Sequence, residues 1–223
     1  MCCAGCHKTR RCKKQAKHRI RETPRYNPWI EEIGMHILRA GERIAAPWKN
    51  GGGVTMEVAV HPKGAGFDDF GWRISIARID RGGPFSSFPG IDRELAMLEG
   101  QVLLNVGGRP AVALSADSRP VRFPGDVPAG AELVGEGAVD LNVMTRRGLF
   151  ASSMIRQRDG ATDPDALATF LFPLEPIAVR GSSGEILSRG DAVLLAPGES
   201  AALPEADYYR ISIFRGENQP QSR

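Results

Sequence analysis

The sequence predicts an all-β fold, a doubled β-sandwich or barrel of the antiparallel jelly-roll kind with few short helices. The 223 residues include 26 glycines and 16 prolines, which typically separate short strands by turns. Several segments alternate apolar and polar residues with the period of two expected of strands. A faint internal repeat also relates 123–133 to 188–203, because each contains Gly-Asp followed by Pro with Gly nearby. The repeat indicates two related β-modules.

Three segments show the alternation most clearly, and each predicts a strand with one aliphatic face. Strict alternation in 54–60 places on one face Val54, Met56, Val58 and Val60. In 72–77 it places on one face Trp72, Ile74 and Ile76. In 139–145 the corresponding residues are Val139, Leu141, Val143 and Thr145. Their polar faces carry Thr55 and Glu57, Arg73 and Ser75, and Asp140 and Asn142. Shorter strands are expected at 101–105, 111–114, 185–188, 191–195 and 208–214, and one short helix from Asp163-Pro164 to Phe170.

Residues 1–34 differ in composition from the rest of the chain. They hold nine lysines and arginines and three acidic residues, so the remainder of a chain with net charge +3 carries −3. Cys3, Cys6 and His7 match a haem-attachment pattern, and with Cys12 they offer zinc ligands. The interpretation that we favour is an unstructured basic tail, or an extension upstream of a natural start at Met35. Residues 218–223 are expected to be a second tail.

The composition of residues 35–223 excludes several classes of function. Their negative balance gives no electrostatic reason for nucleic-acid binding. No apolar run reaches the roughly 18 residues of a membrane helix, and the basic start lacks the apolar core of a secretory signal. The absence of cysteine after Met35 fits a reducing compartment. We therefore expect a cytoplasmic protein that binds neither nucleic acid nor a membrane.

Few residues of the usual catalytic and metal-binding types are present in this part. His36 and His61 are its only histidines, whereas a barrel metal site needs two or three with a carboxylate. The serines in 83–90 lack the Gly-x-Ser-x-Gly elbow and are explained as turn residues. In "PWKNGGG" (47–53), lysine precedes the glycines and a strand follows them, which excludes a phosphate loop. Two interpretations of this segment remain. It is either the rim of a pocket, whose glycines let a ligand approach the backbone, or a flexible hinge.

The polar strand faces allow two interpretations. An ordinary sandwich exposes them to water, whereas a ligand-binding barrel turns them toward a cavity. In a cavity, Lys49, Arg73 and either Arg146 or Arg147 could hold a carboxylate, because guanidinium groups bind it through two parallel hydrogen bonds. The sequence thus leaves open a binding protein, an enzyme and a structural or interaction module.

Five strings in order, "PWKNGGGVTMEVA" (47–59), "WRISIARI" (72–79), "GPFSSFPGIDRELAMLEG" (83–100), "FPGD" (123–126) and "DLNVMTRR" (140–147), together resemble the HutD/Ves family. The resemblance covers residues 35 to about 215. It implies a cupin-type jelly roll with two cupin-like barrels in one chain, here 35–150 and 151–217. Family members accompany histidine-utilisation enzymes and are thought to regulate that pathway, by binding an intermediate such as N-formylglutamate or urocanate.

The resemblance also places the expected site. Because the usual cupin metal histidines are missing, it implies a pocket that binds a small carboxylate with no metal and no cofactor. A homodimer is an open alternative to a monomer. An enzyme using Glu57 or Asp92 as general base, an isomerase, epimerase or hydrolase, is the alternative. The expected ligand-binding residues are Trp48, Lys49, Asn50, Thr55, Glu57, Arg73, Ser75, Ser86, Ser87, Phe88, Asp92, Arg93, Asp140, Asn142 and Arg146.

Overall fold

The structure, a computed structural model, describes residues 35–48, 51–179, 185–199, 201 and 203–216. In this part of the chain the regular structure is β, apart from one 3-10 turn, η1 (Ala40–Glu42). The all-β prediction is therefore confirmed. Two expected site residues, Lys49 and Asn50, lie outside the described residues. So do both expected tails, with Cys3, Cys6, His7 and Cys12.

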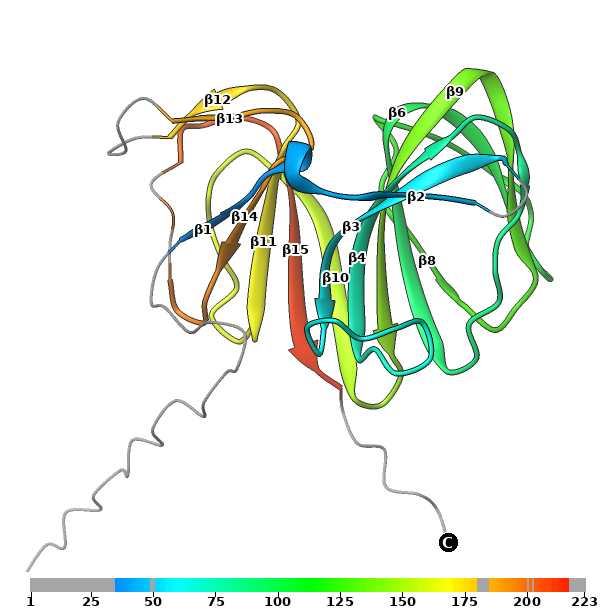
Figure 1. The fold of residues 1–223 in the computed structure, drawn as a ribbon, viewed down its shortest axis with the longest axis horizontal. Coiled ribbons are helices and arrows are strands. Elements are labelled where there is room, and N and C mark those ends of the chain that lie inside the picture. The colour runs from blue at the N-terminus through cyan, green and yellow to red at the C-terminus, as the bar shows by residue number, and fades with distance from the viewer. Residues whose placement is uncertain (1–34, 49–50, 180–184, 200, 202, 217–223) are drawn as a thin grey trace, which may run out of the picture.

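One lobe is built from a single eight-stranded sheet, cyan to green in Figure 1. Its hydrogen-bonded order is β2-β3-β4-β9-β6-β7, with β5 on β9 and β8 on β6. The strands are β2 (Ala45–Pro47), β3 (Gly53–His61), β4 (Trp72–Ile79), β5 (Gly83–Pro84), β6 (Ile91–Val106), β7 (Val112–Ser115), β8 (Val121–Pro124) and β9 (Ala129–Arg146).

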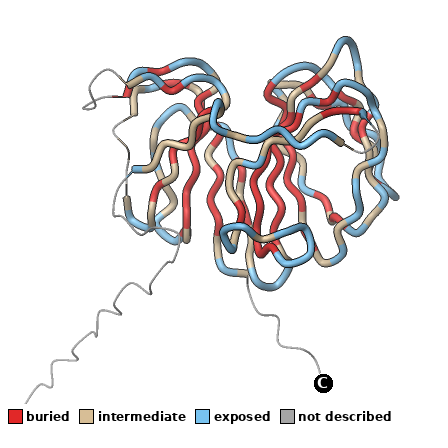
Figure 2. Tube along the Cα trace, viewed as in Figure 1, coloured by how far each residue is buried: buried red, intermediate tan, exposed pale blue. Residues whose placement is uncertain are grey.

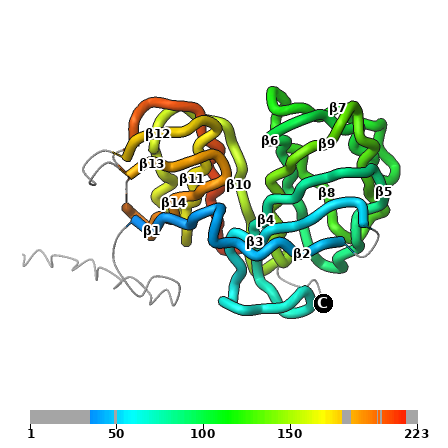
Figure 3. The backbone as a smooth tube through the Cα atoms, turned by 45° about the horizontal axis from the view of Figure 1, so that its top comes forward, coloured from blue at the N-terminus to red at the C-terminus, as the bar shows by residue number. Residues whose placement is uncertain are grey.

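The long antiparallel pair of β6 and β9 makes this sheet curl. The register shifts between Met97 and Glu99 and again before Gln101, and such bulges bend a strand and increase its twist. One end of the pair carries β8 and β4, and the other end carries β7 and β5. The sheet therefore wraps around its own interior, as the green strands show in Figure 3.

The second lobe contains a five-stranded sheet of order β1-β14-β11-β15-β10 and the small β12–β13 pair. Its strands are β1 (His36–Leu38), β10 (Phe150–Gln157), β11 (Ala168–Pro173), β12 (Ile177–Ala178), β13 (Ile186–Leu187), β14 (Ala192–Leu195) and β15 (Tyr208–Arg215). The blue strand β1 lies beside β14 in Figure 1 and pairs with it antiparallel. The second sheet thus includes residues 36–38, which the expected division assigned to the first barrel.

The largest hydrophobic core lies where the two sheets face each other. Trp72, Ile74 and Ile76 of β4 pack in one cluster with Phe170 of β11 and Ile211 of β15. Figure 2 shows the long buried runs on these central strands. Burying each large apolar side chain contributes about 1.5–3 kcal/mol. The expected aliphatic face of 72–77 is therefore confirmed, and the opposite face of β4 is left for the interior of the first lobe.

The expected alternation fails in β3, where a bulge interrupts the pairing with β4 between Glu57 and Ala59. Met56 and Ala59 both pack against the core between the sheets. Val60 instead joins Phe70 in a separate cluster. The prediction that Met56 and Val60 share a face is wrong, because the extra residue of a bulge inverts the alternation beyond it.

The expected helix from Asp163 to Phe170 is also wrong. A turn opens at Asp163, whose carbonyl accepts a hydrogen bond from the Ala166 N–H over 3.1 Å. Strand β11 then begins at Ala168, and all six of its residues are buried. Because β11 pairs with β14 and β15 on its two edges, pairing and burial outweigh the helix start signal. Short apolar runs do not distinguish a buried strand from a helix.

Candidate functional site

A cavity of about 580 Å³ opens inside the curled sheet. Nine of the expected site residues line it, together with seven residues that the motifs did not single out. The expected nine are Trp48, Thr55, Arg73, Ser75, Ser86, Phe88, Arg93, Asp140 and Asn142, and the additional seven are Ala46, Pro47, Phe67, Ala77, Pro84, Phe85 and Met144.

The strand register explains why the polar side chains meet. Ser75 of β4 lies opposite Asn142 of β9, and Ala77 lies opposite Asp140. Met144 pairs with Arg73 on β4 and with Arg93 on β6, so both arginines flank it. Residues that are directly opposite in neighbouring strands point to the same face of a sheet. The polar faces of β4 and β9 therefore line the interior of the lobe instead of meeting solvent.

Arg73 lies in the cavity wall with 8% of its surface exposed. Its Nε donates to Glu57 Oε2 over 2.8 Å, and its guanidinium carbon lies 4.8 Å from the centre of the Phe67 ring. The ion pair uses one of the five N–H groups of the guanidinium. Arg73 is thus a fixed cation that retains donor capacity toward a ligand.

Arg93 is equally buried, and its guanidinium lies over two aromatic rings. Its guanidinium carbon lies 4.9 Å from the Phe85 ring centre and 5.2 Å from that of Phe123, and Nε donates to Asn142 Oδ1 over 3.4 Å. Burial lowers the pKa of Arg93 to about 10, although the nearby Asp140 carboxylate acts in the opposite direction. Arg93 therefore remains a cation at neutral pH.

Asp140 is the carboxyl group of the cavity wall, and 4% of its surface is exposed. Its Oδ1 has no hydrogen-bond partner among the described residues. Burial raises the pKa of Asp140 to about 7, while the Arg93 charge and a hydrogen bond from the Ala77 backbone oppose the rise. A carboxyl group with this pKa is present in both protonation states at neutral pH.

The "PWKNGGG" segment forms one edge of the cavity through Pro47 and Trp48. The indole Nε1–H donates to Thr55 Oγ1 over 2.8 Å, and the Trp48 N–H donates to the Gly53 carbonyl over 2.9 Å. Gly51 has a φ of +65°, and a Cβ on Gly53 would collide with the Arg78 carbonyl. The described glycines do not line the cavity. They shape the turn that positions Trp48, and they do not provide the expected backbone surface for a ligand.

The other expected residues lie outside the cavity wall. Glu57 is exposed and reaches the site only through Arg73, and Ser87 is exposed. Asp92 accepts a hydrogen bond from Arg147 Nη2 over 2.7 Å. Arg146 donates through Nε to the Phe70 carbonyl over 2.9 Å, which fixes the loop before β4. The expectation that Arg146 or Arg147 faces the cavity is therefore not met in the structure, because both bind neighbouring chain segments.

The described residues contain no group of three His, Cys, Asp or Glu side chains close enough to hold a metal ion. His61 stacks on Trp72 with ring centres 5.7 Å apart, and burial lowers its pKa. His36 lies in β1 of the second lobe. No helix in the described ranges has the length and apolarity that a membrane span requires.

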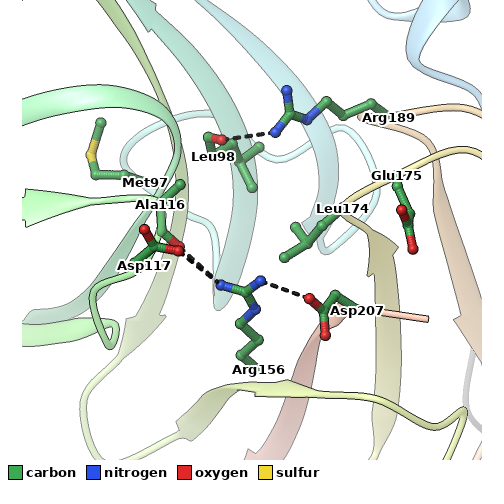
Figure 4. A pocket seen from close by; sticks show the side chains of 9 residues that line it. All are labelled: Met97, Leu98, Ala116, Asp117, Arg156, Leu174, Glu175, Arg189 and Asp207. Carbon is green, nitrogen blue, oxygen red and sulfur yellow. Dashed lines mark hydrogen bonds and ion pairs between the residues drawn. The ribbon is translucent and has the colours of Figure 1, made fainter. Parts of the chain in front are cut away.

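A smaller hollow of about 190 Å³ lies between the lobes (Figure 4). Arg189 extends to the Leu98 carbonyl over 3.2 Å and to Glu99 Oε1 over 2.6 Å. Arg156 bonds Asp207 over 2.7 Å and lies 3.7 Å from Asp117. Since both cations already face carboxylates, this hollow serves as a junction between the lobes, and the larger cavity is the candidate ligand site.

Comparison with known proteins links the chain to a bacterial family. The family model described as HutD matches residues 40–210. An uncharacterised 21.2 kDa protein from the hutC 3′ region of Pseudomonas putida is 38% identical over 117 residues, which are 49% of this chain and 57% of that protein. Protein Ves of Citrobacter koseri is 40% identical over 101 residues, 45% of this chain and 52% of Ves. The matches thus span about half the length of these curated relatives.

Solved structures show the same fold. HutD from Pseudomonas fluorescens SBW25, in a formate condition, aligns with a TM-score of 0.68 and 27% identity over 82% of this chain and 99% of that one. Oxalate decarboxylase of Bacillus subtilis aligns with a TM-score of 0.55 and 10% identity over 83% and 78% of the two chains, which supports a cupin-like fold alone. Because the family model covers more than half of the sequence, the chain belongs to the HutD family.

Proposed function

We propose that this chain is a metal-independent binding protein for a small carboxylate, and that it regulates histidine utilisation. The observation that carries the proposal is the pair of buried cations, Arg73 and Arg93, in the wall of one cavity. Arginines bind carboxylates through charge-assisted hydrogen bonds, which are stronger in a partly desolvated cavity. Ser75 and Asn142 beside them supply further polar contacts that orient the ligand.

The relatives suggest which carboxylates to test. One relative is encoded in the hutC 3′ region, and a HutD homologue has been solved in a formate condition. Formate is therefore one candidate, and N-formylglutamate and urocanate, which the family resemblance implies, are the other two. The cavity volume of about 580 Å³ lies within the range of typical small-molecule sites. We further propose that the chain works in the cytoplasm and that each lobe is one of two cupin-like barrels.

Calorimetric titration with these three compounds tests the binding function. At least one should bind, and Arg73→Ala should weaken that binding about ten-fold or more, because a hydrogen bond to a charged group contributes about 1.5–3 kcal/mol. Arg147→Ala is the matched control, since Arg147 pairs with Asp92 outside the cavity. Absence of binding at millimolar concentration, or equal effects of the two substitutions, would reject the proposal.

The enzyme alternative has less support from the geometry. Neither Glu57 nor Asp92, the expected general bases, lines the cavity, and both are engaged in ion pairs with arginine. A general base must come within hydrogen-bonding reach of the proton that it removes. NMR spectra of each candidate ligand incubated with the protein should show no new signals and no exchange of carbon-bound protons for deuterium.

A further inference from the structure

Among the described residues, Asp140 is the only acidic residue that lines the cavity. It forms no ion pair within 4.0 Å in this part of the chain, whereas Arg73 pairs with Glu57. Its carboxyl group is buried, and Oδ1 accepts no hydrogen bond from the part of the chain that the structure describes. An unsatisfied buried polar atom costs about 1–3 kcal/mol. A ligand that supplies a partner for this oxygen recovers that free energy, so the atom marks a contact point.

The charges around Asp140 determine which partner fits. Arg93 faces it from β6 and Arg73 lies in the same wall on β4, and Glu57 on β3 neutralises Arg73. On β9 the neighbouring lining residues, Asn142 and Met144, are uncharged. The remaining lining residues lie in β2, β3, β4 and the segment 84–88 or are Trp48 and Phe67, and all of them are uncharged.

With Asp140 ionised, the two arginines and the two carboxylates cancel, and the site has no net charge to attract an anion. With Asp140 protonated, the site carries one positive charge and Asp140 gains an O–H donor. An ionised Asp140 would also repel the carboxylate that the arginines hold, because like charges a few ångströms apart oppose each other strongly in a low-dielectric cavity.

We infer that Asp140 binds the ligand as a neutral carboxylic acid that donates a hydrogen bond to a ligand oxygen, so that binding takes up a proton wherever Asp140 is ionised in the free protein. This inference rests on the binding function proposed above and specifies how its carboxylate ligand is recognised. Asp140 is then a specificity-determining residue for an oxygen acceptor. Burial of the carboxyl group favours its neutral form before any ligand is present, because it raises the pKa of Asp140 to about 7.

Titration calorimetry measures the proton directly. Formate and N-formylglutamate are suitable probes, because their carboxylates stay ionised between pH 6 and 8, whereas the imidazole of urocanate titrates there. At pH 7, the binding heats measured in phosphate and in Tris should differ, because each buffer releases the proton that is taken up with its own ionisation enthalpy. The difference should correspond to about half a proton per ligand, as linkage requires for a group titrating near pH 7. Affinity should rise about ten-fold from pH 8 to pH 6, following the protonated fraction.

Asp140→Asn supplies the matched variant, because an amide donates a hydrogen bond but does not titrate. It should bind the probe at pH 8 at least as tightly as the wild type and show neither proton uptake nor pH dependence. Asp92→Asn, the same change outside the cavity, should keep both. Binding without proton uptake in the wild type, or uptake that persists in Asp140→Asn, would overturn the inference but leave the binding function intact. If neither probe nor urocanate binds, the binding function itself fails.

The wild-type measurement does not depend on the variant. If Asp140→Asn does not fold, the buffer comparison and the pH slope of the unmodified chain still decide, and an affinity that falls from pH 8 to pH 6 contradicts proton uptake. His61 should not contribute to the pH dependence of the affinity, since its ring packs against Trp72 and Phe150 and does not line the cavity.

Discussion

The Arg73 guanidinium donates to Glu57 Oε2 over 2.8 Å, across the bulge in β3. The two side chains differ in exposure, because 10% of the Arg73 side chain and 42% of the Glu57 side chain is accessible. The Glu57 carboxylate therefore lies on the solvent side of the Arg73 guanidinium, which itself lines the cavity. Glu57 competes with any anionic ligand for Arg73.

Replacing Glu57 should consequently strengthen anion binding. Glu57→Gln keeps the size of the side chain and removes its charge, so formate or N-formylglutamate should bind several-fold more tightly in calorimetric titration. Because the Glu57 side chain is nearly half exposed, the free energy of unfolding should change by less than about 1 kcal/mol. Weaker binding in Glu57→Gln would show instead that Glu57 contacts the ligand.

Arg93 should not tolerate replacement by lysine. The guanidinium lies over the rings of Phe85 and Phe123, whereas an ammonium group is more strongly hydrated and lacks the planar surface that packs on an aromatic ring. Arg93→Lys should weaken ligand binding about ten-fold and lower the melting temperature. Arg119→Lys, on an exposed residue, is the control. Equal melting curves for the two variants would contradict a stabilising role of the contacts between Arg93 and the two aromatic rings.

Gly53 should be the most sensitive of the described glycines in the "PWKNGGG" turn. A Cβ at this position would meet the backbone carbonyl of Arg78 on β4, and backbone cannot move aside cheaply. Gly53→Ala should destabilise the fold by about 1–3 kcal/mol in urea unfolding, as overpacking does elsewhere. Gly64→Ala has open space and a φ of +82°, so it measures the cost of backbone strain alone and should lose about 1 kcal/mol. A smaller loss for Gly53→Ala than for Gly64→Ala would contradict the packing argument.

Asp191 should stabilise the attachment of β1 to the second sheet. Its carboxylate accepts hydrogen bonds from the Ala40 N–H over 2.7 Å, from the Ser188 N–H over 2.9 Å and from Arg39 over 2.9 Å. Burial alone would raise the pKa of Asp191, but these hydrogen bonds outweigh it and hold the pKa below its usual value. Asp191→Asn should reduce the free energy of unfolding by about 2–4 kcal/mol at pH 7.

The pH dependence of this loss follows from the lowered pKa. The stabilisation by Asp191 is fully present above the unfolded pKa of about 4 and disappears as the pH falls through the lower folded value. Chemical unfolding between pH 3 and 7 should therefore show the wild type and Asp191→Asn converging at acid pH. Asp165→Asn, an exposed residue, should track the wild type throughout, and a pH-independent difference for Asp191→Asn would contradict the linkage.

Much of the site was predictable because it follows from local rules. The faces of β4 and β9 alternate with period two, so Arg73, Ser75, Asp140 and Asn142 could be assigned to one side of their strands from the sequence alone. The alternation also assigns Met144 to that face, and Met144 lines the cavity although it is not among the expected ligand-binding residues. Phe85 lies in the motif 83–100, beside the expected residues Ser86 and Phe88.

Other features depend on contacts between distant segments. The sequence around Phe67 contains no signal for a cavity wall, because its place depends on the path of the loop that Arg146 fixes. The bulge in β3 arises from its pairing with β4, and the strand nature of β11 depends on two neighbours at its edges. None of these partners is adjacent in the sequence.

By itself, the sequence determined the all-β class, the family and the polar character of the faces that now line the cavity, since alternation and motif order are properties of the chain. Only the tertiary structure decided that the face containing Asp140 is enclosed, that Arg93 lies near it and that Oδ1 has no hydrogen-bond partner within the described ranges. The physical reason is that desolvation and charge interactions depend on distances between strands that the linear order of residues does not specify.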